Sequence, residues 1–527
     1  MGRILWGRMK WLIPAVLIFS SVLVHAQDKY WVFFKDKAGV SFDPYEYFDS
    51  KAIDRRIRLN LPLYDVQDLP VNQDYICGVK NITNSHEETS RWLNAISVSA
   101  NTKTLSRISQ LSYVSHIEPV TSYSCVLKVK KGREHSFKTN ISDEEKKLLR
   151  KQVSVLGAEA FERNGLNGKG IRIAVFDGGF PGVDKSPVFE HIRNENRIIA
   201  TYDFVRKREF VYSGMSHGTM VLSCIGGILD EQKMGLATGA EFLLARTEVN
   251  LETISEEENW LAAVEWADKN GADIINSSLG YTYHRYFSKD MDGKTTLVSR
   301  AANIAAKKGI LVVNAMGNDG NNHWEVLGAP ADADSVLSVG GIDPETHYHI
   351  YFSSFGPTAD KRLKPNVSAY GKAMVADKRK LRKAYGTSFA APLVTGFAAC
   401  AWQSNPNFSN MDVFREVQKS GSLYPYYDYA HGFGIPKASY FTDTTKQNGV
   451  TFDLNIVDGF VHIVLQENPA DESSDYVYYH LKKINGGLKK YAVVVPEQKK
   501  VLSFALEELK NITLTVHYKG YTKEFKQ

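Results

Sequence analysis

The sequence Tyr385-Gly386-Thr387-Ser388-Phe389-Ala390-Ala391-Pro392 decides the fold, because a glycine turn leads there directly into a long apolar segment. This pattern predicts a core helix with Ser388 at its N-terminus. Backbone N–H groups and the helix dipole favour negative charge at that end of a helix. A nucleophilic serine needs such a place, since its attack on a carbonyl creates an oxyanion. An ordinary N-cap before a core helix explains the same residues, so this stretch by itself leaves the role of Ser388 open.

Two upstream segments supply an acid and a base. Residues 171–176 form an apolar run that predicts a buried parallel strand, and Asp177 follows at its C-terminal end. His217 begins a second apolar segment that predicts another helix. A serine hydroxyl is a weak nucleophile that needs a base, and histidine has the pKa for that task near neutral pH. An aspartate would fix the tautomer of the histidine and stabilise the imidazolium.

The three segments together resemble the subtilisin-like serine proteases, the subtilases. Asp177, His217 and Ser388 follow the subtilisin order, which differs from the chymotrypsin and α/β-hydrolase orders. His-Gly-Thr matches the family, and Gly-Thr-Ser-Phe-Ala-Ala-Pro stands for its Gly-Thr-Ser-Met-Ala-x-Pro. The chain departs at Gly178, where Ser or Thr is usual, and at Met220, where His is usual. The resemblance implies a serine endopeptidase with Ser388 as nucleophile, His217 as base and Asp177 as the residue that orients it.

A fourth segment, residues 311–320, resembles the subtilase strand that ends in Ala-Gly-Asn. By this resemblance Asn318 is the oxyanion asparagine, whose amide acts together with the Ser388 backbone N–H. Asn314 is the competing candidate, but Asn318 follows Gly317 directly, as in the family. A turn residue beside glycine is the simpler interpretation of Asn318.

The resemblance also assigns residues to substrate binding. Ser278, Leu279 and Gly280 follow an apolar strand and would pair with the substrate backbone before the scissile bond. A plain core strand that ends at a glycine turn explains the same residues. Gly328 falls at the base of the expected S1 pocket, where it leaves room for a bulky apolar side chain unless the insert 321–324 refills the pocket.

Apolar strands and helical segments alternate through the middle of the chain, which predicts an α/β fold with a parallel sheet and helices on both faces. The expected elements are the strands 240–245, 272–277 and 309–314 and the helices 255–270 and 297–308. Together with the resemblance, this pattern implies a subtilisin-like α/β domain, and the resemblance also implies a small α+β propeptide domain before it, while a small β-sandwich is expected after it.

Residues 1–26 predict a secretory signal peptide, with a basic start, an apolar run and small residues before Gln27. A membrane anchor is the alternative, but the apolar run is short for a span. The protein is therefore expected to be secreted, with the extracellular medium or cell surface as its place and the periplasm as the alternative. No stable membrane span is expected once the signal is removed.

Residues 27–120 predict a separate domain that resembles the inhibitory propeptide of subtilases. Its segment 114–120 resembles the tail that threads the active site as a product. A permanent accessory module is the alternative for this domain. Its longest expected helix covers 43–59, with an exposed side that carries Arg55, Arg56 and Arg58.

Residues 121–150 predict a polar linker and maturation region, in which the charge run 142–147 is expected to be solvated. The catalytic domain is expected over 151–442 and opens with a helix over 153–164. Residues 446–527 alternate in short strands and predict a small antiparallel β-sandwich. The strands expected there are 450–456, 460–465, 491–495, 501–505 and 512–518.

The composition of the chain gives no sign of a nucleic-acid partner, a cysteine metal site or a disulfide framework. A net charge of +5 over 527 residues is modest, so nothing calls for a nucleic-acid partner. No CxxC pair suggests a metal site, and no disulfide framework is expected from the four cysteines, Cys77, Cys125, Cys224 and Cys400. Calcium stabilises many subtilases, but no acidic loop identifies its ligands, so structural calcium stays an expectation without residues and no other cofactor is assigned.

Three functions remain compatible with these motifs. The first is a secreted endopeptidase that is made as a zymogen, acts on protein or peptide substrates and binds its own propeptide. The second is a non-catalytic binding or adhesion protein on a protease scaffold, because fold does not guarantee function. The third is a protease that processes only itself. The presence of Asp177, His217, Ser388 and Asn318 together favours the first.

Overall fold

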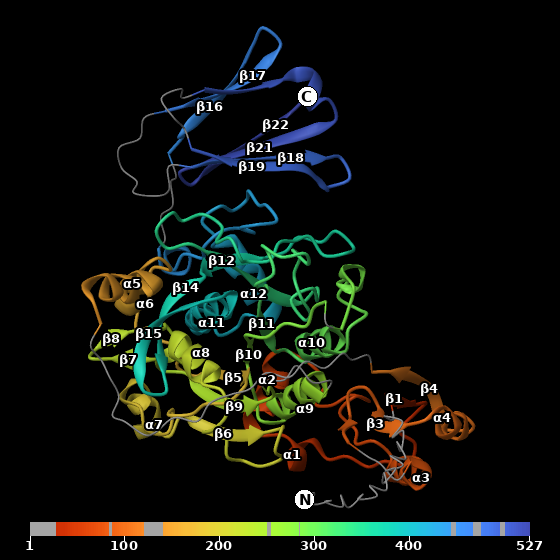
Figure 1. Ribbon diagram of the computed structural model, residues 1–527. Helices are drawn as coiled ribbons and strands as arrows, with labels where there is room; N and C mark the ends of the chain where they lie inside the picture. The colour runs from red at the N-terminus through yellow and green to blue at the C-terminus, as the bar shows by residue number, and fades with distance from the viewer. Residues whose placement is uncertain are drawn as a thin grey trace, which may run out of the picture.

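The computed structural model describes three domains: an N-terminal α+β domain, a central α/β domain and a C-terminal β domain (Figure 1). The described residues are 28–83, 87–120, 141–249, 255–283, 285–443, 449–466, 476–495 and 501–527. The expected signal peptide and most of the expected linker fall outside these ranges. None of the helices within them has the length and hydropathy that a membrane span requires.

Seven parallel strands form the centre of the molecule, in the order β13-β12-β11-β10-β5-β9-β6. The chain crosses from β9 on one side of β5 to β10 on its other side. Ligands of such doubly wound sheets bind at the carboxyl ends of the strands where the winding reverses. The strands are β5 (Arg172–Asp177), β6 (Ile198–Asp203), β9 (Glu241–Arg246), β10 (Ile274–Ser277), β11 (Leu311–Ala315), β12 (Val336–Ile342) and β13 (Val367–Tyr370).

Helices cover both faces of this sheet, which confirms the expected α/β class. Ile173 and Val175 of β5 pack with one group of helices, while Ala174 and Phe176 pack with the other, and all four are fully buried. Burial on both faces explains why the strands read as continuous apolar runs. The first face carries α8 (His217–Gly226) and α11 (Thr387–Ser404), and the second carries α9 (Ser255–Lys269) and α10 (Leu297–Lys307).

The N-terminal domain is a four-stranded antiparallel sheet that lies against α9 and α10 (Figure 1). Trp31, Phe33 and Trp92 join the hydrophobic core of those two helices, while α3 and α4 pack on the opposite side of the sheet. The elements are β1 (Asp28–Phe34), α3 (Gln73–Thr83), β2 (Thr89–Ser90), β3 (Ala95–Ala100), α4 (Thr102–Ile108) and β4 (Val114–Pro119).

The prediction that residues 114–120 form a tail in the active site is wrong for most of that segment. Residues Val114–Pro119 form β4, an edge strand that pairs with β1 along its length. Glu118 of this strand accepts from Arg300 of α10 at 2.8 Å. The segment that resembles the family's tail is therefore a strand of the N-terminal sheet.

The predicted helix 43–59 is replaced by two short helices, α1 (Pro44–Tyr47) and α2 (Ser50–Arg58). Arg55 and Arg56 are only 1% and 2% exposed, so the prediction of an exposed arginine face is wrong for these two. Their partner is Asp268 in α9, more than 200 residues away, which no local pattern reveals. We call residues 43–69, which include both helices, the arm.

The charge run 142–147 is solvated, as expected, but it begins the helix α5 (Asp143–Ser154) and so does not belong to a linker. Ser142 and Glu145 form a capping box, and Leu148 and Leu149 are buried in the core of the central domain. The expected opening helix over 153–164 is instead the end of α5 and the separate α6 (Ala158–Arg163), with the left-handed Gly157 between them.

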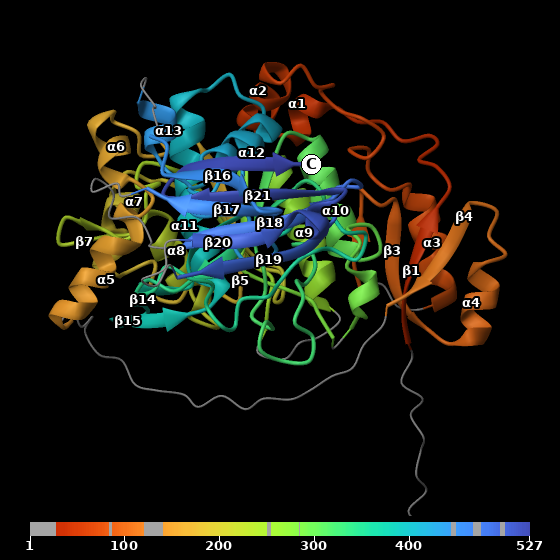
Figure 2. The same ribbon diagram turned by 90° about the horizontal axis from the view of Figure 1, so that it is seen from above.

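Two antiparallel sheets form the C-terminal domain, which covers one side of the central domain (Figure 2). Side chains from both sheets share one core, as expected for a β-sandwich. The expected strands agree with the structure, but two were missed, β18 and β22. The sheets contain β16 (Phe452–Val457), β17 (Phe460–Leu465) and β20 (Val501–Ala505), and β18 (Val477–Lys483), β19 (Leu488–Val494), β21 (Ile512–Tyr518) and β22 (Tyr521–Lys526).

Short elements complete the described chain. They are α7 (Glu190–Asn194), β7 (Ile228–Leu229), β8 (Gln232–Lys233), the hairpin of β14 (Lys372–Asp377) and β15 (Lys380–Tyr385), α12 (Asn410–Lys419), α13 (Ser439–Thr442), and the 3₁₀ turns Pro187–Phe189, Ser288–Asp290 and Leu506–Leu509.

We expect Gln152→Ala to destabilise the central domain. The fully buried Gln152 side chain donates to the carbonyls of Met234 and Met374 and accepts from the Met374 N–H. Because the substitution leaves these buried groups unsatisfied, it should cost about 2–3 kcal/mol. Calorimetry should show the thermal midpoint of this domain lowered by about 4–8 °C. Arg150→Ala, on the exposed side of the same helix, is the control, and an equal effect of both variants would contradict the assignment.

Candidate active site

Asp177 and His217 meet where a strand ends and a helix begins. Asp177 is the last residue of β5 and is fully buried, and His217 is the first residue of α8. The Asp177 Oδ2 atom lies 2.8 Å from Nδ1 of His217, and its Oδ1 accepts from the Gly178 N–H at 2.7 Å. Burial by itself lowers the pKa of His217, but the adjacent Asp177 carboxylate more than offsets this, so the pKa is raised above its ordinary value.

Ser388 lies in the first turn of α11, directly after the Gly386 turn. Gly386 has a φ of +143°, a conformation that favours glycine. The ring of Phe389, the next residue after Ser388, lies 5.5 Å from the ring of His217, so the N-termini of α8 and α11 come together. The Ser388 hydroxyl donates to the carbonyl of Ser278 at 3.2 Å, and the Ser278 hydroxyl donates to the carbonyl of Ser388 at 2.9 Å.

Asn318, and not Asn314, lies beside the serine turn. The Asn318 Oδ1 atom accepts from the Thr387 backbone N–H at 2.8 Å and from the Thr387 hydroxyl at 3.1 Å. Asn314 is buried, and its amide donates to the carbonyls of Leu279 and Ala315. The carbonyl end of the Asn318 amide is therefore fixed by the serine turn, while Asn314 is part of the strand core.

Ser278, Leu279 and Gly280 extend beyond β10 and become more exposed in that order. A Cβ built on Gly280 would have no neighbour within 4 Å, so one side of this segment is open. The next residue, Tyr281, exchanges two backbone hydrogen bonds with Ala329, at 2.9 and 3.0 Å. These bonds place Gly328 beside the same segment.

The insert that follows Asn318 contributes one buried side chain, Trp324, near the segment 278–280. Trp324 is buried, joins the core cluster that includes Ala329, and donates through its indole N–H to the carbonyl of Leu327 at 3.2 Å. Leu279 packs against the same cluster. The expectation of empty space at Gly328 is wrong in the direction of a Cβ, because a Cβ there would lie 2.7 Å from Cγ2 of Thr282 and 3.1 Å from the Tyr281 carbonyl oxygen.

Local sterics explain the glycine after Asp177. A Cβ built on Gly178 would lie 2.1 Å from the Cε atom of Met215, so a serine or threonine does not fit while this methionine is in place. The Gly178 carbonyl accepts from Nε of Arg246 at 3.1 Å, and Arg246 is paired with the buried Asp203 at 2.9 Å.

Sequence reasoning missed several supporting residues, namely Thr387, Arg246 and Asp203. Each acts on a residue that is distant in the chain, so no spacing or periodicity points to its partner. Only Thr387 stood inside a motif that the sequence had singled out.

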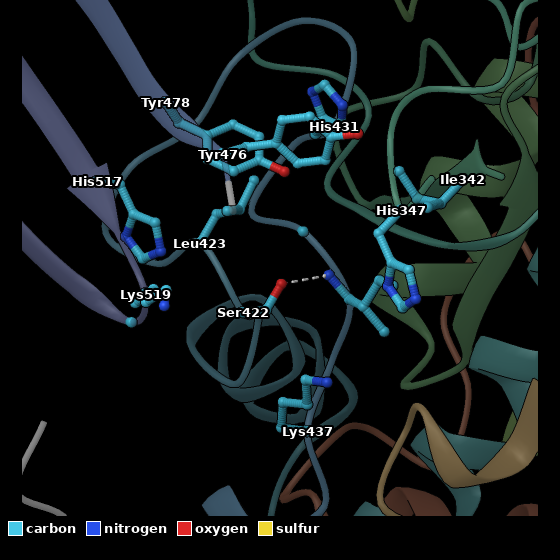
Figure 3. Close-up of a pocket in the computed structure, with 13 residues that line it drawn as sticks. Ile342, His347, Ser422, Leu423, His431, Lys437, Tyr476, Tyr478, His517 and Lys519 are labelled. Atoms are coloured by element: carbon cyan, nitrogen blue, oxygen red, sulfur yellow. Dashed lines mark hydrogen bonds between the residues drawn. The ribbon is translucent and has the colours of Figure 1, made fainter. Parts of the chain in front are cut away.

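A cavity of about 290 Å³ lies elsewhere, between the central and C-terminal domains (Figure 3). Side chains of His347, His431 and Lys437 from the central domain face His517 and Lys519 of the C-terminal domain across it. This cavity contains none of the site residues predicted from the sequence. The described ranges hold no group of three or more His, Cys, Asp or Glu residues placed to bind a metal ion, so structural calcium stays without assigned ligands.

Comparisons with known proteins find related chains and domains. Residues 168–434, slightly more than half of the 527 residues, match the model of the "Subtilase family", and residues 29–137 match the "Peptidase S8 propeptide domain, Bacteroidota". Subtilisin DY of Bacillus licheniformis is 27% identical over 51% of this chain and 90% of its own length. Subtilisin NAT of Bacillus subtilis subsp. natto is 27% identical over 62% of this chain and 80% of its own length. The crystal structure of MycP1 from Mycobacterium smegmatis is similar with a TM-score of 0.47 and 21% identity, over 62% of this chain and 94% of that one.

We expect Asp177→Asn to lower the pKa of the His217 ring, because the substitution removes the charge that offsets burial. The measurement is a pH titration of the His217 ring signals by NMR in the full chain. Ser388→Ala is the matched control, since the Ser388 hydroxyl bonds Ser278, and it should leave the pKa raised. An unchanged pKa in Asp177→Asn would show that the carboxylate does not set it.

Proposed function

Because the chain belongs to the subtilase family and is a serine endopeptidase with an N-terminal propeptide domain, we propose that Ser388 is its nucleophile, with His217 as general base and Asp177 as the residue that orients that base. The observation that carries this assignment is the 2.8 Å contact of Asp177 with Nδ1 of His217, at the meeting point of α8 and α11. It leaves the other ring nitrogen of His217 for the serine.

The reaction follows from these positions. With its Nδ1 proton held by Asp177, neutral His217 presents Nε2 as an acceptor. The Ser388 hydroxyl must turn from the Ser278 carbonyl toward this nitrogen, and its oxygen then attacks the substrate carbonyl as Nε2 takes the proton. The imidazolium then gives the proton to the amine nitrogen as the C–N bond breaks. The amine departs, and the acyl group remains on Ser388. Water, activated by His217 in the same way, then releases the acid product.

Asn318 supports the proposal as an oxyanion donor. Thr387 donates twice to Oδ1 of Asn318, so the amide is held at its carbonyl end and its N–H groups remain for a ligand. The backbone N–H of Ser388, in the first turn of α11, is the second proposed donor. Two fixed donors stabilise the tetrahedral intermediate without needing to reorganise during the reaction.

Substrate would bind as an extended strand along Ser278, Leu279 and Gly280. The open side of Gly280 and the continuation of β10 favour such β-augmentation. The side chain before the scissile bond would enter near Gly328, beside the Trp324 indole. The substrates proposed are therefore proteins or peptides with accessible extended segments.

The rest of the chain fits an exported zymogen. We propose a signal peptide over 1–26, an inhibitory domain that ends near 120, and a central domain that starts close to 141, because α5 already packs in its core. Export to the extracellular medium or cell surface accords with the predicted signal, with the periplasm as the other location. A C-terminal β-sandwich from about 446 completes the proposed organisation.

A fluorophosphonate probe tests the nucleophile. Mature wild-type protein should be labelled on Ser388, and the labelling should vanish in Ser388→Ala. A digest of a peptide library by the same preparation should yield cleaved peptides, and Ser388→Ala should yield none. Absence of labelling in folded wild-type protein would favour a non-catalytic scaffold, while labelling without peptide cleavage would favour a protease that processes only itself.

Asn318→Ala should lower kcat about 10²–10³-fold with little change in KM, because it removes a donor that acts on the transition state. Steady-state kinetics on a peptide identified by the library digest provide the measurement. Asn314→Ala is no suitable control, since Asn314 is a buried strand residue, so Asn322→Ala on the neighbouring insert is used. Equal kcat values for wild type and Asn318→Ala would contradict the proposed role.

A further inference from the structure

The hairpin of β14 and β15 lies beside α8 and leads directly into the serine turn (Figure 1). β15 ends at Tyr385, one residue before Gly386. At the tip of the hairpin, a Cβ built on Gly182, in the loop after β5, would lie 2.9 Å from the carbonyl oxygen of Lys378. The hairpin therefore extends from the segment of the proposed nucleophile to the loop that follows the strand of Asp177.

This hairpin is strongly basic. Residues 372–385 contain one acidic side chain, Asp377, and six basic ones, Lys372, Lys378, Arg379, Lys380, Arg382 and Lys383. A group of like charges at the border of a cleft raises the local concentration of ligands with the opposite charge. The hairpin is thus suited to attract negatively charged parts of a substrate.

Arg382 is the basic residue of the hairpin that contacts the helix of His217. Its Nη2 atom donates to Sδ of Met220 at 3.0 Å, and Met220 lies one turn after His217 in α8. Its Nε atom donates to Oδ2 of Asp377 at 3.1 Å. The Arg382 side chain is nevertheless 40% exposed, so both partners hold the guanidinium in position without covering it.

Most donors of this guanidinium remain available to a ligand. Arg382 has five N–H donors, of which Asp377 takes one and the Met220 sulfur, a weak acceptor, takes another. No residue in the described part of the chain accepts from its Nη1 atom. A guanidinium that is already fixed can bind a carboxylate through charge-assisted hydrogen bonds at little ordering cost.

Arg382 is also close enough to His217 to influence the charge of its ring. Burial lowers the pKa of His217 and the Asp177 carboxylate raises it above its ordinary value, while the positive charge of Arg382 lowers it. The effect of one charge on another falls with distance and is screened by water. The guanidinium therefore lies beside the ring that gives its proton to the leaving amine.

The two halves of a substrate meet different parts of the site. The half before the scissile bond, which becomes the acyl group, is proposed to lie along residues 278–280 beyond β10. The half after the scissile bond starts at the leaving nitrogen, which must lie within reach of His217. Met220 and Arg382 border the cleft on this second side.

We propose that Arg382 selects substrates that carry an aspartate or glutamate at one of the first two positions after the scissile bond. The substrate carboxylate accepts from the terminal nitrogens of Arg382, while Asp377 keeps Nε in place. Met220 is uncharged and so does not neutralise the guanidinium. This inference rests on the proposed function, because it concerns the leaving half of a peptide at the same site.

Paired peptides test the selection. Both members of a pair share the residues before the scissile bond, as found by the library digest, and have an amidated C-terminus, so that only a side chain can supply a carboxylate. They differ by glutamate or glutamine at the first or second position after the bond. For mature wild-type enzyme, kcat/KM should be about 5–10-fold higher for the glutamate peptide of at least one pair.

Two substitutions of Arg382 probe the origin of this ratio. Arg382→Gln should abolish the preference for the glutamate peptide, and Arg382→Glu should favour a lysine peptide over the glutamate peptide. Each ratio compares two substrates of one preparation, so it does not depend on how much of a variant is folded. A preference for glutamate that persists in both variants would overturn the proposal, and so would equal kcat/KM values with wild-type enzyme.

Lys383→Gln is the matched control, since it removes the same charge from the next residue of the same strand. Lys383 lines a separate cavity together with Glu144 of α5 and Glu345, so its substitution should leave the preference unchanged. An equal loss of preference in Lys383→Gln and Arg382→Gln would mean that the general charge of the hairpin makes the selection. That result would also overturn the proposal.

The salt dependence of wild-type enzyme gives a readout that needs no variant. Because Arg382 is partly exposed, the preference for glutamate should weaken when the NaCl concentration is raised from about 0.05 M to about 0.5 M. A preference that is insensitive to salt would contradict an origin in this charge.

The outcomes separate this inference from the proposed function. Equal cleavage of both peptides by an enzyme that a fluorophosphonate labels would overturn only the role of Arg382. Cleavage of neither peptide, together with no labelling, would count against the proposed function. Binding of the two peptides to Ser388→Ala would then still decide the inference, because tighter binding of the glutamate peptide is expected and equal binding would overturn it.

Discussion

A parallel sheet that is buried on both faces constrains everything else in this molecule. Side chains of β5 that alternate between the two faces are all fully buried, so neither face can present a polar group to a substrate. Polar groups that act on a substrate or bind a partner must therefore lie at the two edges of the sheet, where the strands end in loops and helices begin. One edge gathers Asp177, His217 and Ser388, and the other receives the arm. The active-site residues and the arm lie at opposite edges because all the strands of the sheet run in the same direction.

Sequence patterns predicted the parts of this structure that depend on local order. The apolar run before Asp177 and the glycine turn before Ser388 are properties of short segments, and their helices and strands lie where they were expected. Asn318 could be separated from Asn314 only by resemblance. The structure supplies the physical difference, because Thr387 fixes the Asn318 amide whereas the Asn314 amide donates to the carbonyls of Leu279 and Ala315.

The predictions that failed concern residues with distant partners. Arg55 and Arg56 have the periodicity and charge of a solvated helix face. Both are nevertheless buried, because each pairs with the carboxylate of Asp268 in the central domain. The charged start of α5 is exposed as expected, but Leu148 and Leu149, which follow it in the same helix, are buried in the core of the central domain, so this segment is not a linker. From the sequence, Gly178 was only a departure from the family pattern. In the structure, the Met215 side chain fills the space that a Cβ at position 178 would need. Hydrophobic pattern and propensity describe one segment at a time, whereas the environment of these residues depends on contacts with residues that are distant in the chain.

The pairing of Arg55 and Arg56 with Asp268 has a consequence for how such proteins can recombine. An N-terminal domain taken from a relative without these arginines would leave the Asp268 carboxylate and the carbonyls of Ala272 and Lys308 without their partners. Conversely, this N-terminal domain placed on a subtilase that has no acid at the position of Asp268 would bring two cations to a surface without a partner for them. The two domains are thus poor candidates for exchange by gene shuffling, and substitutions on either side of the contact are expected to be inherited together.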